Sequence, residues 1–69
     1  MQISARNQLQ GTVKKITEGP INDEVVLEIA PGVEITAVIT KNAAKSLGLY
    51  EGSEAVALVK ASNVMLGVE

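Results

Sequence analysis

Apolar and polar residues alternate with a period of two along most of the chain, which is typical of β-strands that bury one face. In the first such stretch, Leu9 and Val13 share one face, whereas Gln10 and Thr12 share the other. Glycine and proline residues interrupt the alternation and mark turns. The pattern predicts five strands, at Gln2–Thr17, Ile21–Ala30, Val33–Ile39, Glu54–Lys60 and Asn63–Val68.

One short helix is predicted between the third and fourth strands. Lys41–Leu47 contains good helix formers, Thr40 is placed to cap its first turn, and Gly48 suits the left-handed position after its last turn. Gly11, inside the long first strand, predicts a bulge or bend where that strand curls. The order of elements predicts a mainly β protein, an OB-like five-stranded Greek-key barrel with one short helix between strands 3 and 4.

Composition limits how such a barrel can be stabilised. The 69 residues are expected to form a single domain, residues 1–69, with a small core. Cysteine and histidine are both absent, which excludes disulfides and thiolate metal sites and removes the usual general base. Oligomerisation is therefore the expected support. Residues 55–59 are apolar on both faces of their strand, so we expect the outer face to meet another subunit.

The net charge, the lengths of the apolar runs and the spacing of the acidic residues argue against several classes of partner. The net charge of −2 disfavours a broad nucleic-acid surface, which would be basic. No apolar run is long enough to span a bilayer, and no targeting segment is recognisable, so a cytoplasmic protein without a membrane partner is expected. The acidic residues are scattered without the spacing of a metal-binding loop, and a solvated face is their expected role.

Two pairs of hydrogen-bond donors near the chain ends are the candidate chemistry. Ser4 and Arg6 lie two residues apart and so share one strand face, and Lys60 and Ser62 repeat the arrangement. Hydroxyl, guanidinium and ammonium groups suit an oxyanion, whose oxygens only accept hydrogen bonds. Either pair alone is more simply explained as solvated side chains. Two matching pairs in an acidic chain with six basic residues favour a shared oxyanion site.

The start of the predicted helix offers further donors. Residues from Thr40 to Ala43 would present unpaired backbone N–H groups, and Lys41 lies among them. The simpler explanation is that Thr40 only caps the helix.

Three stretches of the chain carry a family resemblance. They are residues 4–8 (Ser-Ala-Arg-Asn-Gln) with the following Leu-Gln-Gly, residues 40–49 followed by Glu51-Gly52, and residues 59–64 (Val-Lys-Ala-Ser-Asn-Val). Together they resemble the Mop (molbindin) family of molybdate-binding domains. The resemblance covers nearly the whole chain and matches the length of stand-alone members. It implies an OB-like barrel, assembly as hexamers (trimers of dimers), and binding of molybdate or tungstate between subunits.

The resemblance also carries over eight anion-binding positions, which are Ser4, Ala5, Arg6, Thr40, Ala43, Lys60, Ala61 and Ser62. The serine, arginine and lysine side chains would bind the anion directly, whereas the alanines and the helix start would supply backbone donors or walls. Some relatives have a serine at the position of Ala43, so a contact there would have to come from its backbone N–H.

The expected function is therefore a non-enzymatic, cytoplasmic store for molybdate and, as a second ligand, tungstate. No cofactor, resident metal or catalytic residue is expected. A structural oligomerisation unit or regulatory OB-type module remains open, with the donor pairs serving as interface hydrogen bonds. A nucleic-acid-binding module is disfavoured, because such modules stack bases on aromatic side chains and Tyr50 is the single aromatic residue here.

Overall fold

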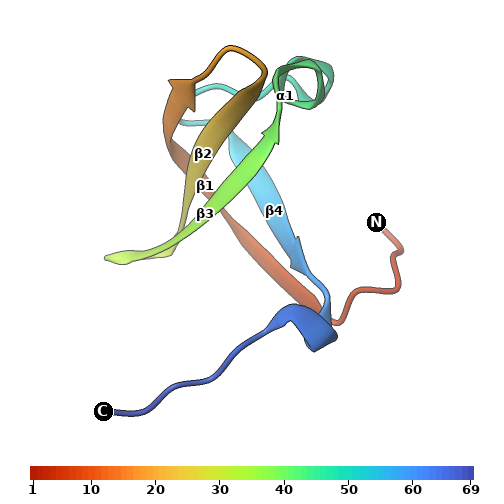
Figure 1. Cartoon of the computed structure of the whole chain (residues 1–69), viewed down its shortest axis with the longest axis vertical. Helices are drawn as coiled ribbons and strands as arrows, with labels where there is room; N and C mark the ends of the chain where they lie inside the picture. Colours follow the sequence, from red (N-terminus) through yellow and green to blue (C-terminus); the bar gives the residue numbers. More distant parts are fainter.

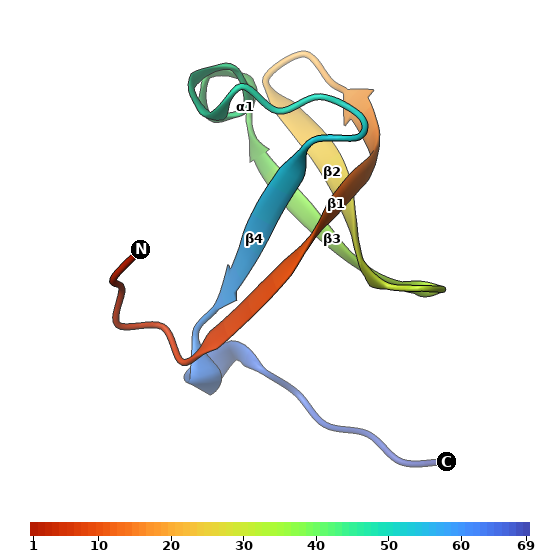
Figure 2. The same cartoon turned by 180° about the vertical axis from the view of Figure 1, so that it is seen from behind.

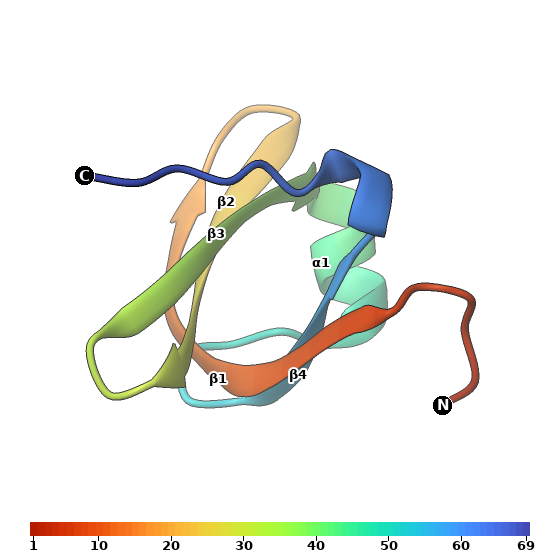
Figure 3. The same cartoon turned by 90° about the horizontal axis from the view of Figure 1, so that it is seen from below.

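The computed structural model describes all 69 residues and contains one curled antiparallel sheet of four strands. The strands lie in the order β3-β2-β1-β4. Figures 1 and 3 show the sheet curled into a half-barrel, with the short helix α1 (Lys41–Leu47) at one end. The strands are β1 (Asn7–Glu18), β2 (Asn22–Ala30), β3 (Val33–Thr40) and β4 (Glu54–Val59).

The prediction of a fifth strand within the chain is wrong. Residues 61–63 form a single 3-10 turn, in which the N–H of Asn63 donates to the carbonyl of Lys60 at 2.8 Å. Residues 64–69 then extend away from the sheet without regular structure (Figures 1 and 2). Their apolar alternation is typical of a strand, but a strand needs a paired neighbour for its backbone groups. Within one chain, this segment has none.

The first strand is also shorter than predicted, because it begins at Asn7 rather than at Gln2. The predicted irregularity is present in this strand but lies beyond Gly11: the register of β1 against β2 shifts between Val13 and Lys15. Gly11 lies just before this bulge, at a close approach of the two strands. A Cβ atom built on Gly11 would lie 2.4 Å from the carbonyl oxygen of Glu28, so only glycine fits there without a backbone shift.

The core is small and lies on the concave face of the sheet. Val13, Val25 and Leu27 are its buried centre. Half-buried side chains surround them from every strand and from the loop after the helix; these are Ile16, Ile29, Ile35, Ile39, Leu49, Ala55 and Ala57. Because few side chains are fully covered, the isolated chain leaves much apolar surface in contact with water.

The helix forms where the sequence predicts it, with both predicted caps. The hydroxyl oxygen of Thr40 accepts from the N–H of Ala43 at 3.0 Å. Gly48 adopts the left-handed conformation with φ 66°, and its N–H donates to carbonyls of the last turn. No helix in the structure has the length and apolar character that crossing a membrane would require.

Candidate functional site

The pairing of β1 with β4 brings the two donor stretches to the same end of the sheet. Asn7 lies opposite Val59 in the last pair of this antiparallel ladder. Residues 4–6 precede Asn7 and residues 60–62 follow Val59, so both stretches continue from this end, as Figures 1 and 2 show. We call it the donor end. The predicted placement of each pair on one strand face is wrong, because residues 4–6 precede β1 and residues 60–62 follow β4. The register of the two strands explains why both stretches nevertheless lie at the same end.

The cations of the donor end are not neutralised within the chain. All four ion pairs in the structure involve either Lys14 or Lys41. Arg6 and Lys60 are exposed and form none. Ser4 and Ser62 are exposed as well, so two cationic groups and two hydroxyls are accessible together. A donor-only set of this kind suits a multiply charged oxyanion.

Two neighbouring amide side chains donate to backbone carbonyls within or directly beside these stretches. Nδ2 of Asn7 donates to the carbonyl oxygen of Val59 at 3.2 Å. Nε2 of Gln8 donates to the carbonyl oxygen of Ala5 at 3.1 Å. Ala5 lies between the two donors of the first pair, and Ala61 begins the 3-10 turn that carries the second. Ala5 and Ala61 therefore lie within the donor end, where they can contribute only backbone groups.

The helix start, in contrast, lies at the opposite end of the sheet. Thr40 ends β3 and pairs with Asn22 at the beginning of β2, whereas the donor end lies at the beginning of β1. Figure 1 shows α1 and the two donor stretches at opposite ends of the molecule. Thr40 and Ala43 therefore do not join the four donor side chains within one chain. The N–H of Ala43 already donates to Thr40, which leaves the threonine hydroxyl free to donate elsewhere.

Lys41 belongs to the scaffold rather than to an anion site. Its ammonium donates to the buried carboxylate of Asp23 at 3.0 Å and to Glu18 at 3.1 Å. The hydrogen bond to Asp23, and then the one to Glu18, raise the pKa of Lys41 above its ordinary value. This ion-paired cluster joins the end of β1 and the start of β2 to the helix. It could not be read from the sequence, because its members are far apart along the chain.

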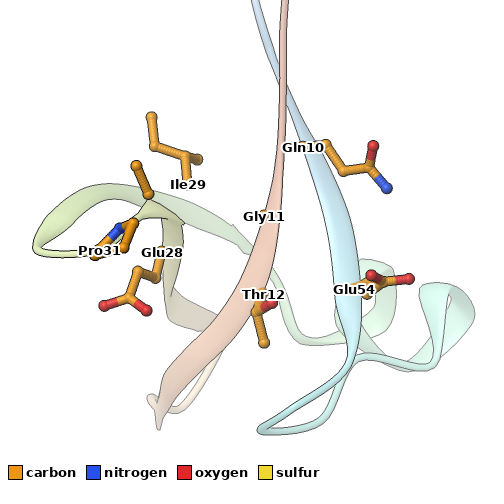
Figure 4. Close-up of a pocket in the computed structure, with 8 residues that line it drawn as sticks. Gln10, Gly11, Thr12, Glu28, Ile29, Pro31 and Glu54 are labelled. Carbon is orange, nitrogen blue, oxygen red and sulfur yellow. The ribbon is translucent and has the colours of Figure 1, made fainter.

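A shallow hollow of about 380 Å3 on the outer face of the sheet has the wrong chemistry for an oxyanion. Figure 4 shows Glu28 and Glu54 on either side of β1, with Thr12 between them. The register places Glu34 beside Glu28 in the same row. Lys14 neutralises part of the row, and its hydrogen bond to Glu34 raises the pKa of the lysine. Carboxylates only accept hydrogen bonds, so they repel an oxyanion. No group of side chains is arranged to hold a metal ion.

An apolar groove of about 570 Å3 lies between β3 and β4, the two free edges of the sheet. Its lining is almost entirely hydrophobic and includes Ile35, Ile39, Ala55, Ala57 and Leu49. Sequence reasoning missed this groove, because it predicted a closed barrel. The relevant signal was the apolar character of β4 on both faces. Val56 and Leu58 of this strand also line the groove and are 38% and 47% exposed.

Sequence comparison places this architecture among known proteins. The family model for the TOBE domain matches residues 3–66. Molybdenum-pterin-binding protein 1 of Clostridium pasteurianum is 48% identical over 66 residues, which cover 96% of this chain and 97% of that protein. A probable molybdenum-pterin-binding protein of Haemophilus influenzae is 45% identical over the whole length of both chains.

Solved structures agree with the sequence comparison. MopII from Clostridium pasteurianum, in an apo form, matches with a TM-score of 0.90 and 46% identity over 97% of this chain and all of that one. The cytoplasmic molybdate-binding protein ModG, with molybdate bound, matches with a TM-score of 0.94 and 52% identity. That match covers all of this chain and 49% of ModG.

Proposed function

The chain belongs to the TOBE-domain family and, within it, to the molybdenum-pterin-binding (Mop) proteins, and from this premise we propose that it is a non-enzymatic molybdate-binding protein. The observation that carries the proposal is the donor end, where Arg6 directly precedes β1, Lys60 directly follows the adjoining β4, neither forms an ion pair, and Ser4 and Ser62 lie two residues from them. Proteins that match the whole chain are named for molybdenum, and the matching ModG structure contains molybdate.

The chemistry of the donor end favours molybdate over phosphate. Molybdate is fully deprotonated near neutral pH, whereas a phosphate monoester has a second pKa of roughly 6 and is partly protonated. A site built only from donors leaves a protonated oxygen without an acceptor. Sulfate is also a dianion, so it must be rejected by size. Tungstate resembles molybdate in charge and shape and is the second proposed ligand. Capture is reversible and uses hydrogen bonds and charge alone.

We propose that the complete site is shared between two copies of the chain. The donor end supplies Ser4, Arg6, Lys60 and Ser62, with backbone groups at Ala5 and Ala61. Thr40 and Ala43 lie at the other end of the sheet, so they adjoin the same anion only from a second copy. Because the N–H of Ala43 donates to Thr40, the proposed role of Ala43 is that of a wall. The free hydroxyl hydrogen of Thr40 supports such a contact. The proposed assembly is a hexamer built as a trimer of dimers, as the family resemblance implies.

The proposed occupant of the apolar groove is the segment 64–69 of a second copy. Both edges of the groove, β3 and β4, have unpaired backbone groups, and an OB-type barrel places its fifth strand between these two. Val64, Leu66 and Val68 are 48%, 96% and 100% exposed and alternate along the segment, as the groove requires. Their burial in a partner would complete both cores.

Removal of residues 64–69 tests this assembly. Light scattering on the parent should give the mass of an oligomer, and the shortened chain should give a smaller mass because neither partner can fill the groove of the other. A shortened chain with the parent's mass would contradict the exchange.

A structural oligomerisation unit or regulatory module is the second candidate. The apolar groove and the exposed outer face of β4 favour it, since both suit protein contacts without any ligand. In that case the donor end would form interface hydrogen bonds only. For either function we propose a cytoplasmic location, as described for ModG.

Calorimetric titration separates the two candidates. Molybdate and tungstate should bind with sub-millimolar dissociation constants, whereas sulfate and phosphate should release no binding heat under the same conditions. Absence of heat with all four anions would contradict the molybdate proposal and leave the structural module. Equal binding of phosphate would contradict the donor-only site.

A further inference from the structure

The two halves of the donor end, residues 4–6 and 60–62, lie outside the sheet, so no strand pairing holds them in place. The ladder between β1 and β4 ends at the pair Asn7 and Val59. Residues 4–6 have no strand partner, and residues 60–62 enter a single 3-10 turn. Backbone without ladder hydrogen bonds is free to move unless other groups hold it. A binding site on such segments loses affinity, since the anion must order them first.

Two consecutive amide side chains add hydrogen bonds at the point where this ladder ends. Successive residues of a strand project to opposite faces, so Asn7 and Gln8 reach different neighbours. Asn7 donates to the carbonyl of Val59, which is joined by one peptide bond to Lys60. Gln8 donates to the carbonyl of Ala5, which separates Ser4 from Arg6. Gln8 is therefore bonded to the middle of the first half, and Asn7 is bonded to Val59, the strand residue from which the second half departs.

We propose that Asn7 and Gln8 form a clamp that positions the two halves of the oxyanion site, an inference that rests on the proposed function. Neutral amides suit this task for an electrostatic reason. A carboxylate in either place could not donate to a carbonyl and would repel the anion, whereas a lysine or arginine would compete for the anion itself. An amide holds the backbone and leaves the charge of the site to Arg6 and Lys60.

Substitutions that keep side-chain size but remove the donor test the clamp. The variants are Asn7→Leu and Gln8→Met, with Gln10→Met as the matched control, because Gln10 is an exposed residue of the same strand and face as Gln8. Backbone NMR order parameters of the ligand-free protein measure the clamp directly, and titration with molybdate measures its consequence. A merely structural role would lower the unfolding midpoint without loosening one donor stretch selectively.

The expected result is specific to each amide. Asn7→Leu should lower the order parameters of residues 60–62, and Gln8→Met those of residues 4–6, from about 0.85 to below about 0.6. Each variant should raise the dissociation constant of molybdate about five- to tenfold, because a smaller fraction of the molecules is competent to bind. Gln10→Met should match the parent in both measurements.

Three outcomes would count against the proposals in distinguishable ways. Unchanged order parameters in both variants would overturn the clamp, whatever their affinity. Loosened stretches with an unchanged dissociation constant would overturn its positioning role. A parent protein that binds no molybdate would overturn the proposed function, and the order parameters would then decide by themselves whether the amides hold the two stretches.

Discussion

The two ends of the sheet present lysines in opposite circumstances. At the helix end, Lys41 donates to Asp23 and Glu18 and holds three elements together. At the donor end, Lys60 forms no ion pair and follows the last residue of its strand. The side chains are identical, so the difference comes from their neighbours. The buried carboxylate of Asp23 neutralises the charge of Lys41, whereas the charge of Lys60 remains available to a ligand.

The comparison of the two ends assigns folding stability to the helix end and anion affinity to the donor end. Groups at the helix end are satisfied by one another, and we expect their loss to cost folding free energy. Groups at the donor end are satisfied only in part, and we expect their loss to cost affinity. Substitutions of Lys41 at the helix end and of the cations at the donor end should therefore move different observables.

The largest expected effect is on binding, at the donor end. Arg6→Ala should raise the dissociation constant of molybdate by about 100-fold, because charge-assisted hydrogen bonds to a guanidinium contribute about 1.5–3 kcal/mol each. The unfolding midpoint of the ligand-free protein should not change. Lys45→Ala is the control, since Lys45 is exposed and lies in the last turn of the helix. Parent-like affinity of Arg6→Ala, measured by calorimetry, would show that the site lies elsewhere.

The next effect should appear in stability, at the helix end. Lys41→Met leaves the carboxylate of Asp23 buried without its cation, which is among the costly outcomes of a single substitution. The urea midpoint should fall clearly below that of the parent, while the folded protein should keep its affinity for molybdate. Lys45→Met is the matched control, because Lys45 is exposed and forms no ion pair, and its urea midpoint should equal that of the parent. If Lys41→Met weakened binding and left stability intact, the assignment of the two ends would be reversed.

A smaller effect should follow the loss of the helix cap. Thr40→Ala removes the acceptor for the N–H of Ala43 and should destabilise the protein by about 1 kcal/mol, as N-cap alanines do. Thr40→Ser keeps the hydroxyl and should restore most of the loss. Equilibrium unfolding measures both. In the shared site, Thr40→Ala should also weaken molybdate binding; an affinity equal to that of Thr40→Ser would remove Thr40 from the proposed site.

The smallest effect concerns pH. The folded structure raises the pKa of Lys41 above its ordinary 10.5, so the native state holds this proton more tightly than the unfolded state does. The stabilisation is fully present below the unfolded pKa and is lost as the pH rises through the folded one. The gap in urea midpoint between the parent and Lys41→Met should be constant from pH 7 to about 10 and should narrow above it. A constant gap at higher pH would contradict the ion pair.

Local sequence signals predicted the hairpin and the helix well. Strands β2 and β3 begin and end within one residue of their predicted limits, because alternation and a Pro-Gly turn are sufficient to define a hairpin. The helix limits agree as well, since Thr40 and Gly48 are recognisable caps. These elements depend on contacts between residues that are close in the chain.

Features that depend on contacts between residues far apart in the chain were predicted less well. The alternation of residues 63–68 predicted a strand, but no edge of the same chain pairs with it. Lys41 could be placed at the helix start but not beside Asp23, which is 18 residues away. The donor pairs of the proposed site could be picked out from the sequence because each spans only three residues. Their arrangement at one end required the register of β1 against β4.

Gly11 has a consequence for the width of the groove. The space that its side chain would occupy is filled by the carbonyl oxygen of Glu28, 2.4 Å from an ideal Cβ, and by Leu27 at 3.0 Å. A single methyl group there would act as a wedge between β1 and β2 at the point where the sheet curves. A flatter sheet would move β3 and β4 apart. The close approach of β1 to β2 at this point, and with it the separation of the two edges between which a further strand would fit, therefore depends on a glycine at position 11.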